Sequence, residues 1–153
     1  MSQYKLIRRS ILAASACGLA IAAASTAKAE DIIIGVATAQ TGGLAPYDQP
    51  SLAGFRMAIN ELNAKGGLGG KYQAKLIIKD TRTDTAQTAT VAQELIDAGA
   101  KIMITPCDAD ASIAAGQLTQ PLNIPTLTFC GTAPILSVAV GDVMFGTYPA
   151  DNV

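Results

Sequence analysis

Residues 63–72, "NAKGGLGGKY", place four glycines within five positions. Glycine clusters of this kind either cradle a phosphate group or end a helix. A phosphate loop needs its glycines between the end of a strand and the start of a helix, where backbone N–H groups face the anion. Here the residues before the cluster have helical apolar spacing, and "AKLIIKD" after it has the pattern of a strand. The cluster therefore predicts a helix C-terminus, with Gly66 or Gly67 in the left-handed conformation.

On both sides of this cluster, strand and helix patterns alternate. The predicted strands are residues 30–37, 74–80, 101–105, 125–129 and 143–147. The predicted helices are one from residue 51 to the glycine cluster, with Leu52, Phe55, Ile59 and Leu62 on one face, then residues 84–98 and residues 111–120. Ser51 is the expected N-cap of the first helix, and Pro121 ends the third. This alternation predicts parallel strands joined by right-handed crossovers, a doubly wound α/β sheet.

The first 29 residues have the pattern of an export signal. Basic residues, Arg8 and Arg9 among them, precede an apolar run over residues 11–24, and "AKA" at 27–29 matches what signal peptidase accepts. We expect cleavage before Glu30 and a periplasmic location. A retained membrane anchor is the alternative, but the run is shorter than the roughly 20 residues that a spanning helix needs. The pattern leaves open whether the Sec or the twin-arginine route is used.

Charge and length restrict what the exported part can do. Without residues 1–29 the chain keeps 7 basic and all 12 acidic residues, a net charge of −5, and it contains no histidine. Nucleic-acid binding needs clustered Lys and Arg, and the chain has no basic stripe. The remaining residues suffice for one hydrophobic core. We therefore expect one acidic α/β domain that does not bind nucleic acid.

Three loops should form any binding site on this fold. In doubly wound sheets, ligands bind outside the carboxyl ends of the strands, near the point where the strand order reverses. The loops that leave those ends are residues 38–50, 106–110 and 130–134. They offer backbone N–H groups at helix starts, the phenol of Tyr47 and the hydroxyl of Thr132. Such groups hold a ligand and do not by themselves transform it.

The second loop resembles the first half of a calcium loop, because oxygen-bearing side chains alternate in "CDADAS" at residues 107–112. The sixth position of such a loop should be Gly and the twelfth Glu, but Ile113 and Thr119 stand there. A metal site is therefore not predicted. We expect instead that Asp110 caps the helix that follows and that Asp108 is solvated.

Two cysteines remain after the export signal. Cys107 and Cys130 each follow a predicted strand, and if those strands are neighbours, the Cα atoms can lie within reach of a disulfide. An oxidising compartment would permit the bridge, which would contribute roughly 3 kcal/mol. Two free thiols are the alternative. A catalytic thiol is disfavoured because the chain has no histidine to activate it.

Common catalytic patterns are missing from the sequence. It has no histidine, no G-x-S-x-G nucleophile elbow and no Cys and His set with metal-ligand spacing. We therefore expect a protein that binds a ligand without a catalytic step, a cofactor or a metal ion. An exported enzyme with the same fold is retained as an alternative.

Several segments, placed on this fold, resemble the substrate-binding proteins of ABC transporters, in the branched-chain amino-acid group with the type I periplasmic-binding fold. The likeness runs from Ile34 to the last residue. Its most specific segments are "QTGGLAPYD", "GFRMAINELNAKGGLGG", the "KD" that ends the second strand, "NIPTLTFCGTAP" and "FGTYPADNV". Together they are specific for the family and not for its ligand, whereas the start of a doubly wound fold alone would fit many functions.

The resemblance implies roles for particular residues. Tyr47 lies where the family has an aromatic wall of the ligand pocket, and Thr132 matches a threonine that hydrogen-bonds the carboxylate and amino groups of the ligand. Cys130 or Gly131 matches a position that contributes backbone. The ligand-binding candidates are Tyr47, Asp108, Ala109, Cys130, Gly131 and Thr132.

Two residues depart from the family pattern. The family commonly has a serine at the position of Asp108, where it receives a ligand carboxylate, and an ionised Asp108 would repel that carboxylate unless it turned away or met a cation. This departure argues against a standard leucine-like ligand. Cys107 matches a half-cystine of some members, but Thr83 stands where the partner would be, which favours pairing with Cys130.

Length is a further departure. Family members have two lobes that close on the ligand like a clamshell, and this chain corresponds to about the first third of such a protein. The resemblance implies that residues 30–150 form the first lobe, that residues 151–153 begin the crossover between lobes, and that the second lobe is absent. We expect the 153 residues alone to bind ligand weakly or not at all, and micromolar binding in calorimetry would contradict this.

These observations lead to one main hypothesis. The protein is a monomeric, periplasmic solute-binding component of an ABC importer, which captures an amino acid or a small organic acid, aromatic acids included, and delivers it to a permease in the inner membrane. The alternative is an extracellular ligand-sensing domain of a receptor or signalling protein with the same fold. Residues beyond Val153 would separate the two, by showing a membrane-spanning helix or none.

Overall fold

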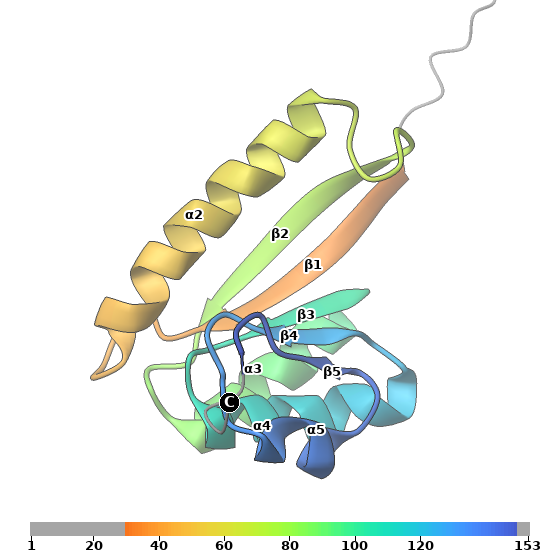
Figure 1. The fold of residues 1–153 in the computed structure, drawn as a ribbon. Coiled ribbons are helices and arrows are strands. Elements are labelled where there is room, and N and C mark those ends of the chain that lie inside the picture. The colour runs from red at the N-terminus through yellow and green to blue at the C-terminus, as the bar shows by residue number, and fades with distance from the viewer. Residues whose placement is uncertain (1–29, 150–153) are drawn as a thin grey trace, which may run out of the picture.

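The computed structural model describes residues 30–149, which form a five-stranded parallel sheet with helices on both faces (Figure 1). The strands are β1 (Glu30–Thr38), β2 (Tyr72–Asp80), β3 (Ile102–Thr105), β4 (Thr126–Thr128) and β5 (Met144–Phe145), and their spatial order is β2-β1-β3-β4-β5. This confirms the doubly wound α/β fold. The expected export signal, its cleavage site and the expected crossover at residues 151–153 lie outside the described residues.

The helices divide between the two faces of the sheet according to the direction in which the chain moves. They are α2 (Ala45–Ala64), α3 (Thr85–Asp97), α4 (Ala109–Thr119) and α5 (Ile135–Val140), with a 3₁₀ turn, η1 (Gln120–Leu122), after α4. The chain steps from β1 outward to β2 through α2, and then back across β1 to β3 and onward through the others. Because right-handed crossovers in opposite directions fall on opposite faces, α2 lies on one face and α3, α4 and α5 on the other (Figure 1).

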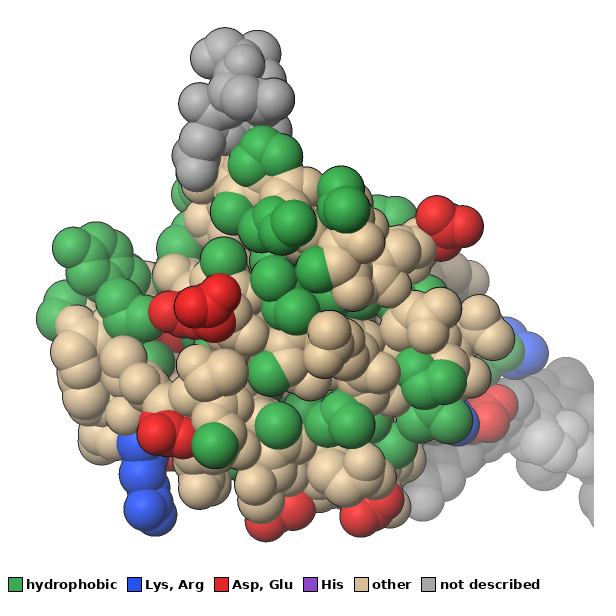
Figure 2. Space-filling view, turned by 90° about the horizontal axis from the view of Figure 1, so that it is seen from below, with side chains coloured by type: hydrophobic (Ala, Val, Ile, Leu, Met, Phe, Trp, Pro, Cys, Tyr) green, Lys and Arg blue, Asp and Glu red, His purple; other side chains and the backbone are tan. Residues whose placement is uncertain are grey.

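Residues of the sheet alternate between two cores. Val36 and Ile104 point to the α2 side, where they pack with Leu52 of that helix. On the other side, Met103 packs against the fully buried Leu95 of α3. The side of α4 and α5 presents scattered hydrophobic and uncharged groups, with acidic residues mainly towards the edges (Figure 2). No helix within residues 30–149 has the length and apolarity that crossing a membrane would require.

The glycine cluster ends α2 as predicted. Gly66 and Gly67 have φ angles of 105° and 81°, and the N–H of Gly67 donates to the carbonyl of Leu62 at 2.9 Å. A Cβ at Gly67 would lie 2.0 Å from the carbonyl oxygen of Tyr72, so only glycine fits beside the start of β2. The cluster thus lies between a helix end and a strand start, at the opposite edge of the sheet from the loops expected to bind ligand.

The predicted start of the first helix was wrong. The helix begins at Ala45, six residues earlier than Ser51, and Ser51 is not its N-cap but an interior residue whose hydroxyl donates to the carbonyl of Tyr47 at 3.2 Å. Two prolines had favoured a loop there. Pro46 lies in the first turn, where a missing N–H costs nothing, and Pro50 removes only one helical hydrogen bond. Tertiary contacts of the first turn, described below, offset that loss.

The expected cap of α4 was also wrong. Asp108, and not Asp110, is the N-cap: its Oδ1 accepts from the backbone N–H of Ala111 at 2.7 Å, and the helix begins at Ala109. Asp108 is therefore engaged with the helix and half-buried, whereas Asp110 is exposed. The alternating acidic residues at 108 and 110 gave two possible caps, and the backbone conformation selects the earlier one. The sequence had also not predicted α5, a helix of only six residues.

Candidate ligand-binding site

The carboxyl ends of four neighbouring strands meet at one edge of the sheet. Their last residues are Thr38, Asp80, Thr105 and Thr128, in β1 to β4 respectively. The loops that leave this edge, residues 39–44, 106–108 and 129–134, lie beside one another because their strands are paired in parallel register. We call this edge with its three loops, together with the first turn of α2, the rim. Five of the six residues that the sequence nominated for ligand binding, Tyr47, Asp108, Cys130, Gly131 and Thr132, lie on the rim, and the sixth, Ala109, is the first residue of α4 directly after it.

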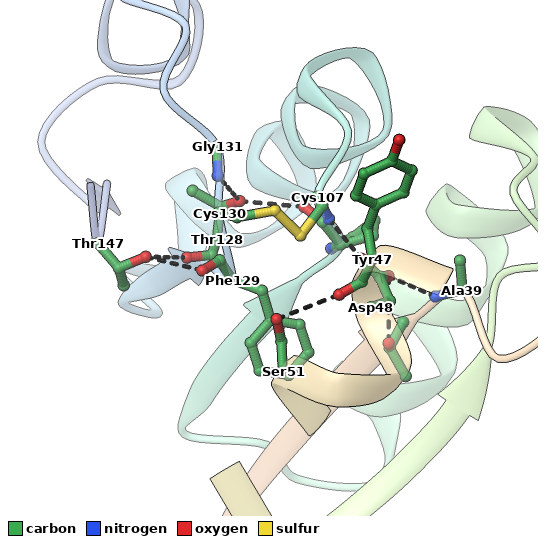
Figure 3. Close-up of a disulfide and its surroundings, with 12 residues drawn as sticks. Ala39, Tyr47, Asp48, Ser51, Cys107, Thr128, Phe129, Cys130, Gly131 and Thr147 are labelled. Atoms are coloured by element: carbon green, nitrogen blue, oxygen red, sulfur yellow. Dashed lines mark hydrogen bonds between the residues drawn. A yellow bond between two sulfur atoms is a disulfide. The ribbon is translucent and has the colours of Figure 1, made fainter. Parts of the chain in front are cut away.

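Tyr47 is the most exposed of the six candidates. It lies in the first turn of α2, its side chain is 64% exposed, and its ring points away from the other side chains labelled in Figure 3. An aromatic ring held on a helix and open to solvent can cover a ligand that settles on the rim. The extra N-terminal turn of α2 places Tyr47 on a helix, whereas the sequence had placed it in a loop.

Its neighbour Asp48 has the opposite environment and was missed by the sequence reasoning. The Asp48 side chain is fully buried. Its Oδ2 accepts from the N–H of Ala39 at 2.6 Å and from the hydroxyl of Thr38 at 3.2 Å, and its Oδ1 accepts from the N–H of Cys107 at 2.8 Å. Asp48 therefore connects α2 to the ends of β1 and β3. Its position four residues before Leu52, in line with the apolar stripe, was the available signal.

A disulfide joins the loops after β3 and β4. Cys107 and Cys130 are bonded, with their Cα atoms 4.9 Å apart (Figure 3). The strands that precede them are direct neighbours, as the pairing of Thr105 with Thr128 shows. Neighbouring parallel strands bring the first residues past their ends within the range that a disulfide spans. The bridge therefore links two of the three candidate loops covalently.

The loop after β4 is held mainly by threonines. The N–H of Gly131 donates to the Thr128 hydroxyl at 2.8 Å, and that hydroxyl donates to the carbonyl of Pro106 at 3.0 Å. The Thr147 hydroxyl lies 3.0 Å from the carbonyl of Thr128 and 2.9 Å from that of Phe129. The N–H of Gly131 is therefore already engaged inside the protein. Thr132, the next residue, is half-buried and lines a small cavity of about 140 Å³.

Asp80 holds the loop after β1 against the end of β2. Its two oxygens accept from the backbone N–H groups of Gln40, Thr41 and Arg82 and from the Thr41 hydroxyl, at distances of 2.7–3.2 Å. Burial raises the pKa of Asp80, but the hydrogen bonds from the Thr41 side chain and from the backbone of Arg82, Thr41 and Gln40 outweigh this and keep the pKa below its ordinary value of 3.8. Asp80 thereby fixes the conformation of the loop after β1.

A large cavity on the α2 face of the sheet does not include the six candidates. It measures about 450 Å³ and is lined by apolar side chains such as Phe55, Ile104, Leu127 and Phe129. The candidates instead lie on the rim or directly after it, and Asp108 borders only a crevice of about 10 Å³. No group of three or more Asp, Glu, Cys or His in that range is arranged to hold a metal ion.

In open, doubly wound α/β sheets, ligands bind outside the carboxyl ends of the strands, which is where the loops of the rim lie. Comparison with protein families matches residues 31–152 to the periplasmic binding protein family, and the chain belongs to this family. The resemblance inferred from the sequence segments is thereby confirmed.

The similar proteins are named as amino-acid-binding proteins or as substrate-binding proteins of transporters. The Leu/Ile/Val-binding protein of Escherichia coli K12 is 29% identical over 134 residues, which cover 88% of this chain and 36% of the relative. The branched-chain amino acid transporter substrate binding protein LivJ of Streptococcus pneumoniae, solved in complex with isoleucine, has a TM-score of 0.74 at 28% identity and is matched over 80% of this chain and 35% of that structure. A substrate-binding protein of Desulfitobacterium hafniense, in complex with Leu, has a TM-score of 0.68 at 27% identity, over 80% and 35% of the two chains. The chain therefore spans about a third of the length of these relatives.

Proposed function

We propose that this chain is the first ligand-binding lobe of a periplasmic solute-binding component of an ABC importer. The observation that carries the proposal is the rim, where residues of three loops and of α2 converge at the carboxyl ends of the strands in a member of the periplasmic binding protein family. The protein captures a small solute and passes it to a permease in the inner membrane. It acts as a monomer, without a catalytic step or cofactor, after export directed by residues 1–29.

The ligand class is an amino acid or a small organic acid, aromatic acids included. Relatives carry names such as Leu/Ile/Val-binding protein, and two of the similar solved proteins hold isoleucine and leucine. In this chain, Tyr47 supplies an exposed aromatic surface on the rim, and Thr132 supplies a hydroxyl. Ala109, Cys130 and Gly131 contribute backbone groups to the ligand-binding surface. The second lobe of the family fold supplies the opposing contacts, so this chain alone binds weakly.

Asp108 sets the charge preference within this class. Its carboxylate already occupies the N-terminus of α4 by capping the N–H of Ala111, so a ligand carboxylate placed there would meet a negative charge instead of unpaired N–H groups. We expect Asp108→Asn to strengthen binding of carboxylate ligands relative to the unchanged protein. Asp110→Asn is the matched control, because this substitution removes the same charge from an exposed side chain two residues further along.

A thermal-shift screen of the complete mature protein tests the proposed function. Amino acids, aromatic acids, dicarboxylates and nucleotides are compared, and a ligand at 100 times its Kd should stabilise the native state by about 2.7 kcal/mol. Stabilisation by one chemical class of acid supports the proposal. No stabilisation by any class contradicts the proposal.

Two variants of α2 locate the ligand once a hit is found. Tyr47 and Met57 are both 64% exposed on this helix, but only Tyr47 lies on the rim. We expect Tyr47→Ala to raise the Kd, and Met57→Ala to leave it unchanged. Equal effects of the two substitutions would place the ligand away from the rim.

A further inference from the structure

Asp48 and Tyr47 are adjacent in the first turn of α2 but have opposite environments. Tyr47 is 64% exposed on the rim, whereas Asp48 has no exposed surface. An acidic side chain is almost never fully buried unless it is compensated by specific partners. The burial of Asp48 therefore requires a structural explanation that the hydrophobic core alone does not supply.

Backbone donors, and not a cation, compensate Asp48. Its two oxygens accept from the N–H groups of Ala39 and Cys107 and from the Thr38 hydroxyl. The ion pairs among residues 30–149 are Lys65–Glu61 and Lys79–Glu94, and neither involves Asp48. Hydrogen bonds to a buried carboxylate are directional and stronger than those between neutral groups. They fix the position of the donors as well as the position of Asp48.

These donors belong to the parts of the chain that form the rim. Ala39 is the first residue past β1, and Cys107 lies two residues past β3. Cys107 is in turn bonded to Cys130 in the loop after β4. One side chain on α2 thus ties three strand ends together, directly for β1 and β3 and through the disulfide for β4. Figure 3 shows the hydrogen bonds from Ala39 and Cys107 to Asp48 and the disulfide from Cys107 to Cys130.

We infer that Asp48 is a positioning residue for ligand binding, which holds the exposed Tyr47 ring in register with the loop of Cys107 and Asp108. The inference rests on the proposed function of the rim. Asp48 does not touch the ligand, because it is fully buried. It acts by fixing the helix turn that carries Tyr47 against the backbone from which the opposite side of the rim is built.

Asn63 provides a matched control at the other end of the same helix. Its side chain also joins α2 to a strand: Nδ2 donates to the carbonyl of Ala74 and Oδ1 accepts from the N–H of Ala74, both at 2.8 Å. Ala74 lies near the start of β2, at the edge of the sheet opposite the rim. Loss of Asn63 therefore weakens the attachment of α2 without disturbing the rim.

The experiment compares Asp48→Asn, Asp48→Ala and Asn63→Ala in the full-length protein with the disulfide intact. The Asn variant keeps one oxygen acceptor but turns an amide N–H₂ towards a backbone N–H. The Ala variant removes all three contacts. With two variants, the test can still be made if one of them fails to fold. Calorimetric titration uses L-isoleucine and benzoate as probes. We expect the Kd to rise roughly tenfold or more in both Asp48 variants, a loss of the size seen when the hydrogen-bond partners that orient metal ligands are removed, and to stay unchanged in Asn63→Ala.

A second measurement requires no ligand. Hydrogen exchange followed by NMR should show lost protection at the amides of Ala39, Tyr47 and Cys107 in the Asp48 variants, and at Ala74 but not at these three in Asn63→Ala. Asp48 variants that are destabilised as much as Asn63→Ala but keep the original Kd would overturn the inference, as would unchanged protection at Tyr47 and Cys107. If the unchanged protein binds neither probe, the failure falls on the proposed ligand class, and the amide measurement still decides whether Asp48 holds the rim.

Discussion

Removal of the Cys107–Cys130 disulfide should destabilise the lobe strongly. The bridge spans a sequence separation of 23 residues, and the loop-closure model assigns a cross-link of that length about 3 kcal/mol, chiefly by restricting the unfolded chain. For a domain of this size, each kcal/mol corresponds to roughly 4 °C in Tm. The double variant Cys107→Ser with Cys130→Ser should therefore melt about 12 °C below the unchanged protein.

Reduction supplies an independent perturbation of the same bond. Dithiothreitol should lower the Tm of the unchanged protein by a comparable amount and should leave the Tm of the double variant where it is. Both proteins are produced from Glu30 onward, so that Cys17 of the export signal does not add a third thiol. Differential scanning calorimetry gives the Tm, and urea unfolding at 25 °C gives the free energy of unfolding.

Two results would refute this reasoning. Titration of the unreduced, urea-unfolded protein could find two free thiols, which would mean that the bond is absent. Alternatively, reduction could shift the Tm by less than about 1 °C, which would mean that the unfolded chain gains little freedom when the bond is broken. Retained stability together with altered ligand affinity would assign the bond a role in shaping the rim alone.

Three further substitutions test the core, a helix contact and the pH response. Leu95→Ala should cost about 2–5 kcal/mol in urea unfolding because Leu95 is fully buried, and a loss below about 1 kcal/mol would contradict its place in the core. Gly116→Ala would put a Cβ 2.7 Å from both γ-carbons of Val140 and should cost about 1–3 kcal/mol, most of which Val140→Ala should restore. Hydrogen bonds lower the pKa of Asp80 below 3.8. The ionised Asp80 therefore stabilises the folded protein above that pH, and this contribution is lost as the pH falls through the folded-state pKa. Asp80→Asn should therefore flatten the acid limb of the stability curve, and an unchanged limb would show that Asp80 contributes nothing to it.

Much of the fold was predictable because its signals are local. The glycine cluster at residues 66–70 can end a helix but cannot begin a phosphate loop where it stands, and the structure bears this out with positive φ angles at Gly66 and Gly67. The β-branched runs and the helical apolar stripes follow from side-chain periodicity within a few residues. The strands and helices they predict occur in the structure, and the family resemblance of their segments is confirmed.

The errors arose where local preference and tertiary contact disagree. Pro46 and Pro50 favour a loop by their own chemistry, but the helix extends through both because Asp48 anchors its first turn to the ends of β1 and β3. Asp108 and Asp110 are equally good N-caps by composition, and the conformation at residue 108 selects the first. The first error depended on contacts with residues distant in the sequence, whereas the second depended on which of two neighbouring residues takes the extended conformation of an N-cap.

The sequence by itself determined the alternation along the chain of the five strands with α2, α3 and α4, the end of α2 and the membership of a family, because these depend on residue type and spacing along the chain. Only the tertiary structure decided that Asp48 is buried, that Cys107 pairs with Cys130, and that Tyr47 stands exposed on a helix at the rim. These features require strand ends far apart in the chain to be neighbours. That adjacency arises from the parallel pairing of β1, β3 and β4, which no single segment of sequence encodes.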